Sequence, residues 1–160
     1  MSKTRIVVAV DPLSLAQLDD LRLAYQAGVL DGEGCIHIAR QKYPAPRRRA
    51  CYRLRLTIAQ NHLRTLADFQ RDVGVEGRIY ETRRTNVQNR DAYALTYDGA
   101  AAAEVIVRLR PFLRRKRPEA TMALEYQAQC EVSTRFGGKG APADIWHLRE
   151  WYYNKLRAMK

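Results

Sequence analysis

Two carboxylates, Asp31 and Glu33, stand at the end of a helix that the sequence predicts, where the chain also carries Gly28, Gly32 and Gly34. A glycine inside a helix costs about 1 kcal/mol, and negative charge is unfavourable at a helix C-terminus. A glycine cap with two solvated acids is the simplest interpretation. The alternative is a functional site, because segments that break local folding rules are often found at such sites.

The chemistry of that alternative depends on bringing two such helix ends together. Ala24, Ala27, Gly28 and Asp31 fall on one face of the expected helix, so a second copy could approach it closely. Carboxylates that meet in this way repel each other unless they share divalent cations, and Mg²⁺ is the natural occupant. Metal ions between an attacking water and a leaving oxygen assist phosphodiester cleavage. The segment therefore predicts both a dimer interface and a metal-dependent hydrolytic site.

The charge of the chain favours a polyanionic partner. The 160 residues include 28 Lys and Arg against 17 Asp and Glu, for a net charge of +11. The excess is local, because residues 40–90 carry 13 bases and 4 acids, and residues 108–117 carry 6 bases and no acid. Arginine outnumbers lysine 22 to 6, and its planar group binds guanine edges and phosphates bidentately. We therefore expect the partner to be a nucleic acid.

Length and composition limit the class of protein. With 46% hydrophobic and 28% charged residues, the chain is typical of one globular domain. The apolar runs at 6–10 and 99–103 are far shorter than a membrane span, and no secretory signal is evident. Three cysteines without C-x-x-C spacing argue against a disulfide framework or a zinc site. These features predict a reducing intracellular compartment, the bacterial cytoplasm or an organelle, and no membrane partner.

Hydrophobic periodicity predicts an α+β fold. Ser14 caps a helix whose apolar residues recur until Gly32 and Gly34 end it. Residues 51–60 alternate between apolar and polar side chains, which is typical of a half-buried strand. The other expected elements are strands over 35–42, 77–84 and 91–97, helices over 62–73 and 118–132, a helix over 100–113 up to a kink at Pro111, and a last helix after a glycine-rich linker. The αββαββα order with an antiparallel four-stranded sheet forms a core domain over 1–132, and 133–160 form a linker and C-terminal helix packed on the same domain.

One face of the sheet is expected to lie under helices and the other to carry polar side chains. Arg53, Arg55 and Thr57 share the polar face of strand 51–60, which is richer in arginine than a solvated face normally is. The further candidates for contact with bases or backbone are His37, Gln41, Tyr80, Thr82 and Arg84 on neighbouring strands, and Arg48 in a loop. The orientation of the fourth strand stays open, because both of its alternating sets of side chains suit a core.

The segment QAGVLDGEG, Gln26–Gly34, resembles the LAGLIDADG motif of homing endonucleases, in the form that ends in DGEG. It departs from the motif at Gln26, where leucine is usual. The resemblance extends over residues 15–130, and three landmarks fall where the family has them. These are Gln60 at the end of the second strand, Arg64 four residues later, and Lys116 in the segment PFLRRK.

The resemblance implies the LAGLIDADG-type fold and, because the chain has a single motif, a homodimer. It implies a site-specific endonuclease that binds a long, near-palindromic DNA duplex and cuts both strands with Mg²⁺, for which Ca²⁺ or Mn²⁺ can substitute in the site. By position Glu33 is the metal ligand, with Gly32 beside it, and Asp31 supports the helix end and the interface. The residues that would position water and stabilise charge at the phosphate are Gln60, Arg64 and Lys116.

Two other classes of function stay open at this point. The same scaffold could serve an intron-splicing maturase, with intron RNA as partner, or a DNA-binding protein that does not cleave. An unrelated RNA-binding domain would not need to dimerise, and its exposed sheet would carry stacking aromatic residues. Arg53, Arg55 and Thr57 favour the recognition of duplex DNA instead.

Overall fold

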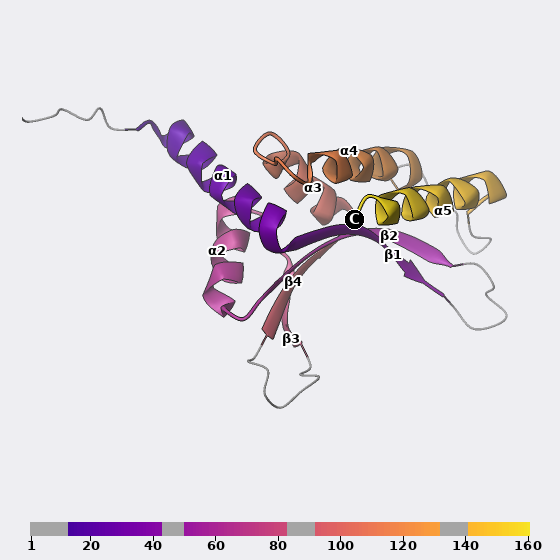
Figure 1. Ribbon diagram of the computed structural model, residues 1–160, viewed down its shortest axis with the longest axis horizontal. Helices are drawn as coiled ribbons and strands as arrows, with labels where there is room; N and C mark the ends of the chain where they lie inside the picture. The colour runs from indigo at the N-terminus through magenta and orange to yellow at the C-terminus, as the bar shows by residue number, and fades with distance from the viewer. Residues whose placement is uncertain (1–12, 43–49, 83–91, 132–140) are drawn as a thin grey trace, which may run out of the picture.

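The computed structural model describes residues 13–42, 50–82, 92–131 and 141–160 of the chain. The described elements, in chain order, are α1 (Leu15–Glu33), β1 (Gly34–Gln41), β2 (Cys51–Gln60), α2 (Leu63–Val73), β3 (Arg78–Thr82), β4 (Ala92–Asp98), α3 (Gly99–Leu109), α4 (Arg117–Tyr126), a π-helical turn (Gln127–Glu131) and α5 (Ala143–Ala158). The α+β class and the αββαββα order are confirmed. Helices α3, α4 and α5 lie over one face of the sheet, and the N-terminal half of α1 projects from it (Figure 1).

The sheet has the strand order β1-β2-β4-β3, and all neighbouring strands are antiparallel. The alternation in β2 divides its two faces as the sequence predicts. Tyr52, Leu54, Leu56 and Ile58 are at most 3% exposed and pack under the helices, while Arg53 is exposed on the opposite face. Burial of such side chains stabilises the fold by about 1.5–3 kcal/mol each.

The fourth strand is oriented by its aromatic and leucine side chains. Leu95 and Tyr97 are fully buried in the core, and Tyr97 donates a hydrogen bond to the carbonyl of Val75 at 3.1 Å. Thr96 is therefore directed to the face that carries Arg53. It is only 4% exposed, because neighbouring side chains on that face cover it.

The first helix ends at the glycines, as the sequence predicts. It continues through Gly32 to Glu33, and Gly34 is its C-cap, where the N–H of Gly34 donates to the carbonyl of Leu30. A side chain at Gly28 or Gly32 would meet no atom within 4 Å, so neither glycine is required by packing within this chain. Tertiary contacts at Asp31, described below, hold this glycine-containing turn in helical form.

The helix expected over 100–113 ends earlier, at Leu109, because Pro111 cannot continue it. The chain then makes a tight turn and starts α4 at Arg117, with Pro118 in its first turn, where proline is tolerated. This short connection between α3 and α4 contains Lys116 and lies against the end of α1.

Helix α5 packs against the core through aromatic side chains. Trp146 donates from Nε1 to the carbonyl of Ala50 at 3.2 Å, and Tyr153 contacts the ring of Tyr52 at a centroid distance of 5.7 Å. The C-terminal end of α5 lies beside the start of β1 (Figure 1). Among the helices in the described ranges, none has the length and apolar character that crossing a membrane requires.

Candidate active site

The carboxylate of Asp31 ties the end of α1 to the connection between α3 and α4. Its Oδ2 accepts hydrogen bonds from the backbone N–H of Arg114 at 2.8 Å and of Arg115 at 3.2 Å, and its Oδ1 accepts one from the N–H of Lys116 at 2.8 Å. The backbone carbonyl of Asp31 accepts a further hydrogen bond from Lys116 Nζ at 2.6 Å. Two segments that are distant in sequence are thereby held together where β1 begins.

These contacts shift the ionisation of both partners. Partial burial acts to raise the pKa of Asp31, but three backbone N–H donors and the Lys116 ammonium outweigh it and hold the pKa below its usual value. Burial lowers the pKa of Lys116, and the nearby Arg115 lowers it further. Lys116 is only 6% exposed. A largely desolvated cation therefore stands at the helix end, where its field acts more strongly than it would in water.

Glu33 is the last residue of α1, and its side chain is exposed. Among the described residues it forms no hydrogen bond or ion pair, in contrast to Asp31. The two acids that the sequence pairs in one motif thus differ in their contacts. Asp31 is bound within the chain, and Glu33 is exposed to solvent. Within the described ranges of a single chain, no cluster of three or more His, Cys, Asp or Glu side chains suited to a metal ion is present.

Gln60 and Arg64 lie near this helix end without touching it. Gly34, which follows Glu33, pairs with Ile58 in the sheet. Gln60 is two residues further along β2, so it lies at the same end of the sheet as Glu33. Arg64 follows in the first turn of α2, with a side chain that is 88% exposed and 3.9 Å from Asp68. In the described part of the chain, no hydrogen bond joins either residue to Glu33 or Lys116.

A cavity of about 560 Å³ opens beside the start of β1. Its lining includes Cys35, Arg115, Lys116 and Lys160, and Lys160 Nζ donates to Cys35 Sγ at 2.8 Å. A hydrogen bond with His37 lowers the pKa of the Cys35 thiol to about 7 against the effect of burial, and the Lys160 ammonium adds to this. The surroundings of the helix end are therefore strongly cationic.

The structure corrects the expected dimer face of α1. Ala27 is fully buried in the core of its own chain, and the carboxylate of Asp31 is occupied by the α3–α4 connection. Ala24 is half-buried, and Gly28 is exposed. The exposed stripe of the helix, which we call the α1 stripe, consists of Leu21, Tyr25, Gly28 and Gly32. Small side chains alone did not reveal which face of α1 is buried in its own chain, because alanine suits a core and a helix contact equally well.

The polar face of the sheet brings together most of the expected contact residues. His37 stands opposite Arg55, and Arg55 Nε forms an ion pair with Asp98 Oδ1 at 2.6 Å. Arg53 is exposed, whereas Gln41 and Thr82 lie at strand ends. Arg48 and Arg84 lie outside the described residues.

Two residues on this face, Thr96 and Asp98, were not expected from the sequence. The Thr96 hydroxyl lies 3.5 Å from that of Thr57 and 3.5 Å from that of Tyr80, so it links three strands. Asp98 fixes Arg55 through the ion pair. Their positions follow from the orientation of β4, in which Leu95 and Tyr97 face the core and Thr96 lies beside Thr57 of β2.

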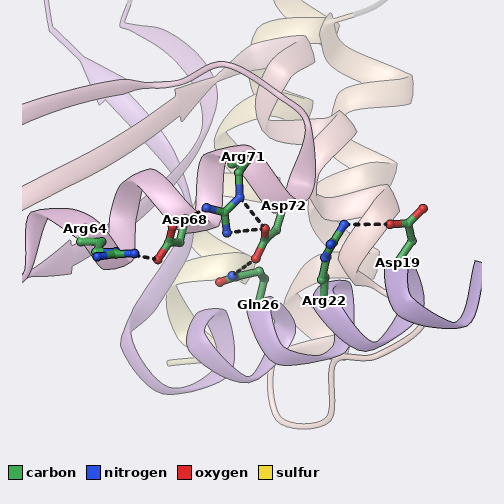
Figure 2. Close-up of polar contacts among 7 residues, drawn as sticks. All are labelled: Asp19, Arg22, Gln26, Arg64, Asp68, Arg71 and Asp72. Atoms are coloured by element: carbon green, nitrogen blue, oxygen red, sulfur yellow. Dashed lines mark hydrogen bonds and ion pairs between the residues drawn. The ribbon is translucent and has the colours of Figure 1, made fainter. Parts of the chain in front are cut away.

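Gln26, where the motif usually has leucine, is 1% exposed and faces α2. Its Nε2 donates to Asp72 Oδ2 at 2.7 Å (Figure 2), while its Oε1 is buried without a partner among the described residues. Arg71 donates to the other oxygen of Asp72 and to Asp68, which also pairs with Arg64. A polar network therefore joins the motif helix to α2 and ends at Arg64.

We expect Asp72→Ala to lower the free energy of unfolding by about 1–3 kcal/mol, because the Gln26 amide would be left buried with no partner. Adding Gln26→Leu removes that amide and is expected to restore most of the stability. Denaturant unfolding at one fixed protein concentration measures both effects. A double variant no more stable than Asp72→Ala would show that the unpaired amide is not the cause.

No protein-family model and no curated protein matches the sequence. Solved structures do match in fold. The homing endonuclease I-CvuI, in complex with DNA, has a TM-score of 0.70 and 19% identity over 89% of this chain and 84% of that chain. The archaeal intron-encoded homing endonuclease I-Vdi141I, complexed with DNA, has a TM-score of 0.68 and 16% identity over 89% of this chain and 86% of that chain.

The LAGLIDADG homing endonuclease I-GzeII, in complex with a DNA target, has a TM-score of 0.62 and 11% identity. That match covers 85% of this chain but 43% of I-GzeII. The chain therefore has the fold of the LAGLIDADG homing endonucleases, and the motif helix α1 takes part in it.

Proposed function

We propose that the chain is a site-specific DNA endonuclease that acts as a homodimer and hydrolyses both strands of a duplex. The observation that carries the proposal is the contact of Asp31 with the α3–α4 connection, which sets the free carboxylate of Glu33 and the buried Lys116 at one helix end. An arginine-bearing sheet face lies next to that helix end. The solved structures of similar fold include DNA complexes, which supports the same class of substrate.

The residues at the helix end fit a divalent cation. Glu33 supplies an exposed carboxylate without a competing partner among the described residues, and hard oxygen donors of this kind suit Mg²⁺ or Ca²⁺. The Gly32 carbonyl at the same helix end is a second oxygen donor. A bound Mg²⁺ would supply charge stabilisation at the phosphate and activation of water.

The chain's own residues would complete the site. Lys116 is held with its ammonium at the helix end, where it can stabilise negative charge that develops on a phosphate. Gln60 lies at the same end of the sheet and can orient a water through its amide. Arg64 is exposed and able to reach the DNA backbone.

Dimerisation would join two α1 stripes. The stripe exposes Tyr25 at 68% and Leu21 at 56%, next to Gly28 and Gly32, whose lack of side chains allows close approach. The match that covers less than half of I-GzeII supports the view that two copies are needed for a complete enzyme. Two copies would also supply two Glu33 carboxylates.

We expect Gly28→Leu to weaken the dimer by about 1–3 kcal/mol, or roughly 5- to 150-fold in its dissociation constant, because leucine overpacks a close helix contact. The chain itself should still fold, since no atom lies within 4 Å of the added Cβ. Sedimentation velocity over a concentration series measures the change, with Ala67→Leu on the exposed side of α2 as the control. A wild-type chain that stays monomeric both free and on DNA would contradict the interface.

We expect sequence specificity to decrease when Arg53 and Arg55 are both replaced by alanine. Arg53 is exposed and Arg55 is fixed by Asp98 on the same face, and each bidentate guanine contact discriminates by about 1–3 kcal/mol. Arg48→Ala should instead weaken binding to all sequences alike and reduce its salt dependence. Binding profiles over a randomised duplex pool test this, and identical profiles for the wild type and the double variant would exclude direct readout by these arginines.

The proposed function is tested by selecting cleaved duplexes from a randomised library in the presence of Mg²⁺. A near-palindromic consensus cut in both strands is the expected result. Binding to a consensus site without any cut would favour a non-cleaving DNA-binding protein. Splicing of an intron RNA without DNA cleavage would favour a maturase.

A further inference from the structure

The last turn of α5 forms a cationic pocket with the edge of the sheet. Strand β1 is an edge strand, and a cavity of about 290 Å³ opens between it and α5. The side chains in its lining that carry charge or polar groups are His37, Arg40, Tyr153, Arg157 and Lys160. No acidic residue of the described chain lines it, and Glu150, which pairs with Arg40 at 3.5 Å, stands outside the lining.

Two of these cations, Arg157 and Lys160, are exposed and form no ion pair with an acidic residue among the described residues. The one side-chain contact of Lys160 in the described part of the chain is with the sulfur of Cys35. Tyr153 and Arg157 are four residues apart and share one face of α5, and Lys160 follows two residues after the helix ends at Ala158. Lys155 points the other way and lies over the ring of Trp151 at 5.7 Å.

The pocket shares the lining residue Lys160 with the cavity beside the candidate active site. Lys160 donates to Cys35 Sγ at 2.8 Å and lines both this pocket and the larger cavity that contains Arg115 and Lys116. That larger cavity includes one acid, Glu119. Because Cys35 and His37 are on the sheet face that carries Arg55, the end of α5 brings positive charge to the border of that face.

We propose that Arg157 and Lys160 bind backbone phosphates of the duplex at the edge of β1, which makes the end of α5 part of the DNA-binding surface. The inference rests on the proposed function and extends it to a helix that the sequence assigns only to packing. Cations without an ion-pair partner, beside a cavity that no acid lines, are suited to phosphate oxygens. Neutralising phosphates releases counterions, so each such contact strengthens the salt dependence of binding.

The test compares Arg157→Gln/Lys160→Gln with the matched control Lys155→Gln. Glutamine keeps part of the side-chain length and removes the charge, and thermal unfolding checks that each variant is folded. Binding to a labelled random-sequence DNA duplex is titrated in Ca²⁺ over a series of KCl concentrations. We expect the double variant to reduce the slope of log K against log salt by about 0.9 for each phosphate that is no longer neutralised, and to bind roughly tenfold or more weakly at low salt. The control should keep the wild-type slope.

Each other outcome overturns a defined statement. A double variant with the slope of the Lys155→Gln control would overturn the role of α5 and leave the proposed function intact. A weakening seen with an RNA duplex but not with DNA would also overturn the assignment. A wild-type chain that does not bind duplex DNA would overturn the proposed function itself, and the inference with it.

Discussion

Glu33→Gln is expected to abolish cleavage of both DNA strands while duplex binding stays at the wild-type level or improves. Glutamine has the same shape, so the end of α1 keeps its packing, but the amide lacks the charge that holds a divalent cation. Loss of several kcal/mol of charge stabilisation in the transition state corresponds to about 1,000-fold or more in rate. Binding need not suffer, because removing the carboxylate also relieves repulsion from the DNA backbone. A gel assay in Mg²⁺ and a binding titration in Ca²⁺ measure the two quantities.

Glu76→Gln is the matched control for this variant. Glu76 is exposed in the connection between α2 and β3 and is not among the residues placed at the candidate site, so the same change of charge should leave cleavage unaltered. If Glu33→Gln cuts both strands at the wild-type rate, the assignment of Glu33 as a metal ligand is wrong. An equal decrease of cleavage in both variants would point to net charge as the cause.

The fold was predictable wherever local pattern and tertiary packing agree. The alternation over Cys51–Gln60 predicts the bounds of β2, because each apolar side chain meets the helices. The periodicity before Gly74 likewise predicts α2, and Gly74 adopts the left-handed conformation with a φ of 64° that favours glycine at a helix end. Pro111 indicates a break, although the helix stops two residues before it.

The sequence predicted less where the environment of a residue depends on a segment that is distant along the chain. The glycines predict where α1 ends, but they do not indicate that three N–H donors from the α3–α4 connection bind the Asp31 carboxylate at that end. The burial of Gln26 depends on Asp72, 46 residues away in sequence. No local pattern in the chain indicates that this amide has a partner.

At the candidate site, too, some features were predictable from the sequence and others were not. The motif and its spacing predict that Glu33 and Lys116 belong to one site, and the structure brings Lys116 to the end of α1 through the Asp31 carbonyl. The faces of α1 were harder to assign, because Ala24, Ala27 and Gly28 have little hydrophobic contrast. Only the packing against α2 and the sheet places Ala27 inside and Gly28 outside.

Asp31→Asn is expected to lower the free energy of unfolding by about 2–4 kcal/mol and to affect stability more than the cleavage step. The carboxylate accepts three backbone hydrogen bonds through both of its oxygens, and bonds to a charged group contribute about 1.5–3 kcal/mol each, less where they are exposed. In asparagine one oxygen becomes an NH₂ group, which would face an N–H donor. Denaturant unfolding at fixed protein concentration measures the decrease. Asp20→Asn is the control, because Asp20 is exposed on the same helix and has no partner among the described residues.

The decrease should also depend on pH in a defined direction. The pKa of Asp31 is lower in the folded chain than its usual value, so its charged form stabilises the fold above the unfolded pKa of about 3.9. That contribution disappears as the pH falls through the folded pKa, and the stability difference between the wild type and Asp31→Asn should shrink accordingly in acid. A difference that is equal at neutral and strongly acidic pH would mean that the backbone hydrogen bonds to Asp31 do not depend on its charge. If Asp31→Asn is as stable as Asp20→Asn at neutral pH, the carboxylate of Asp31 is not what stabilises the contact between α1 and the Lys116 segment.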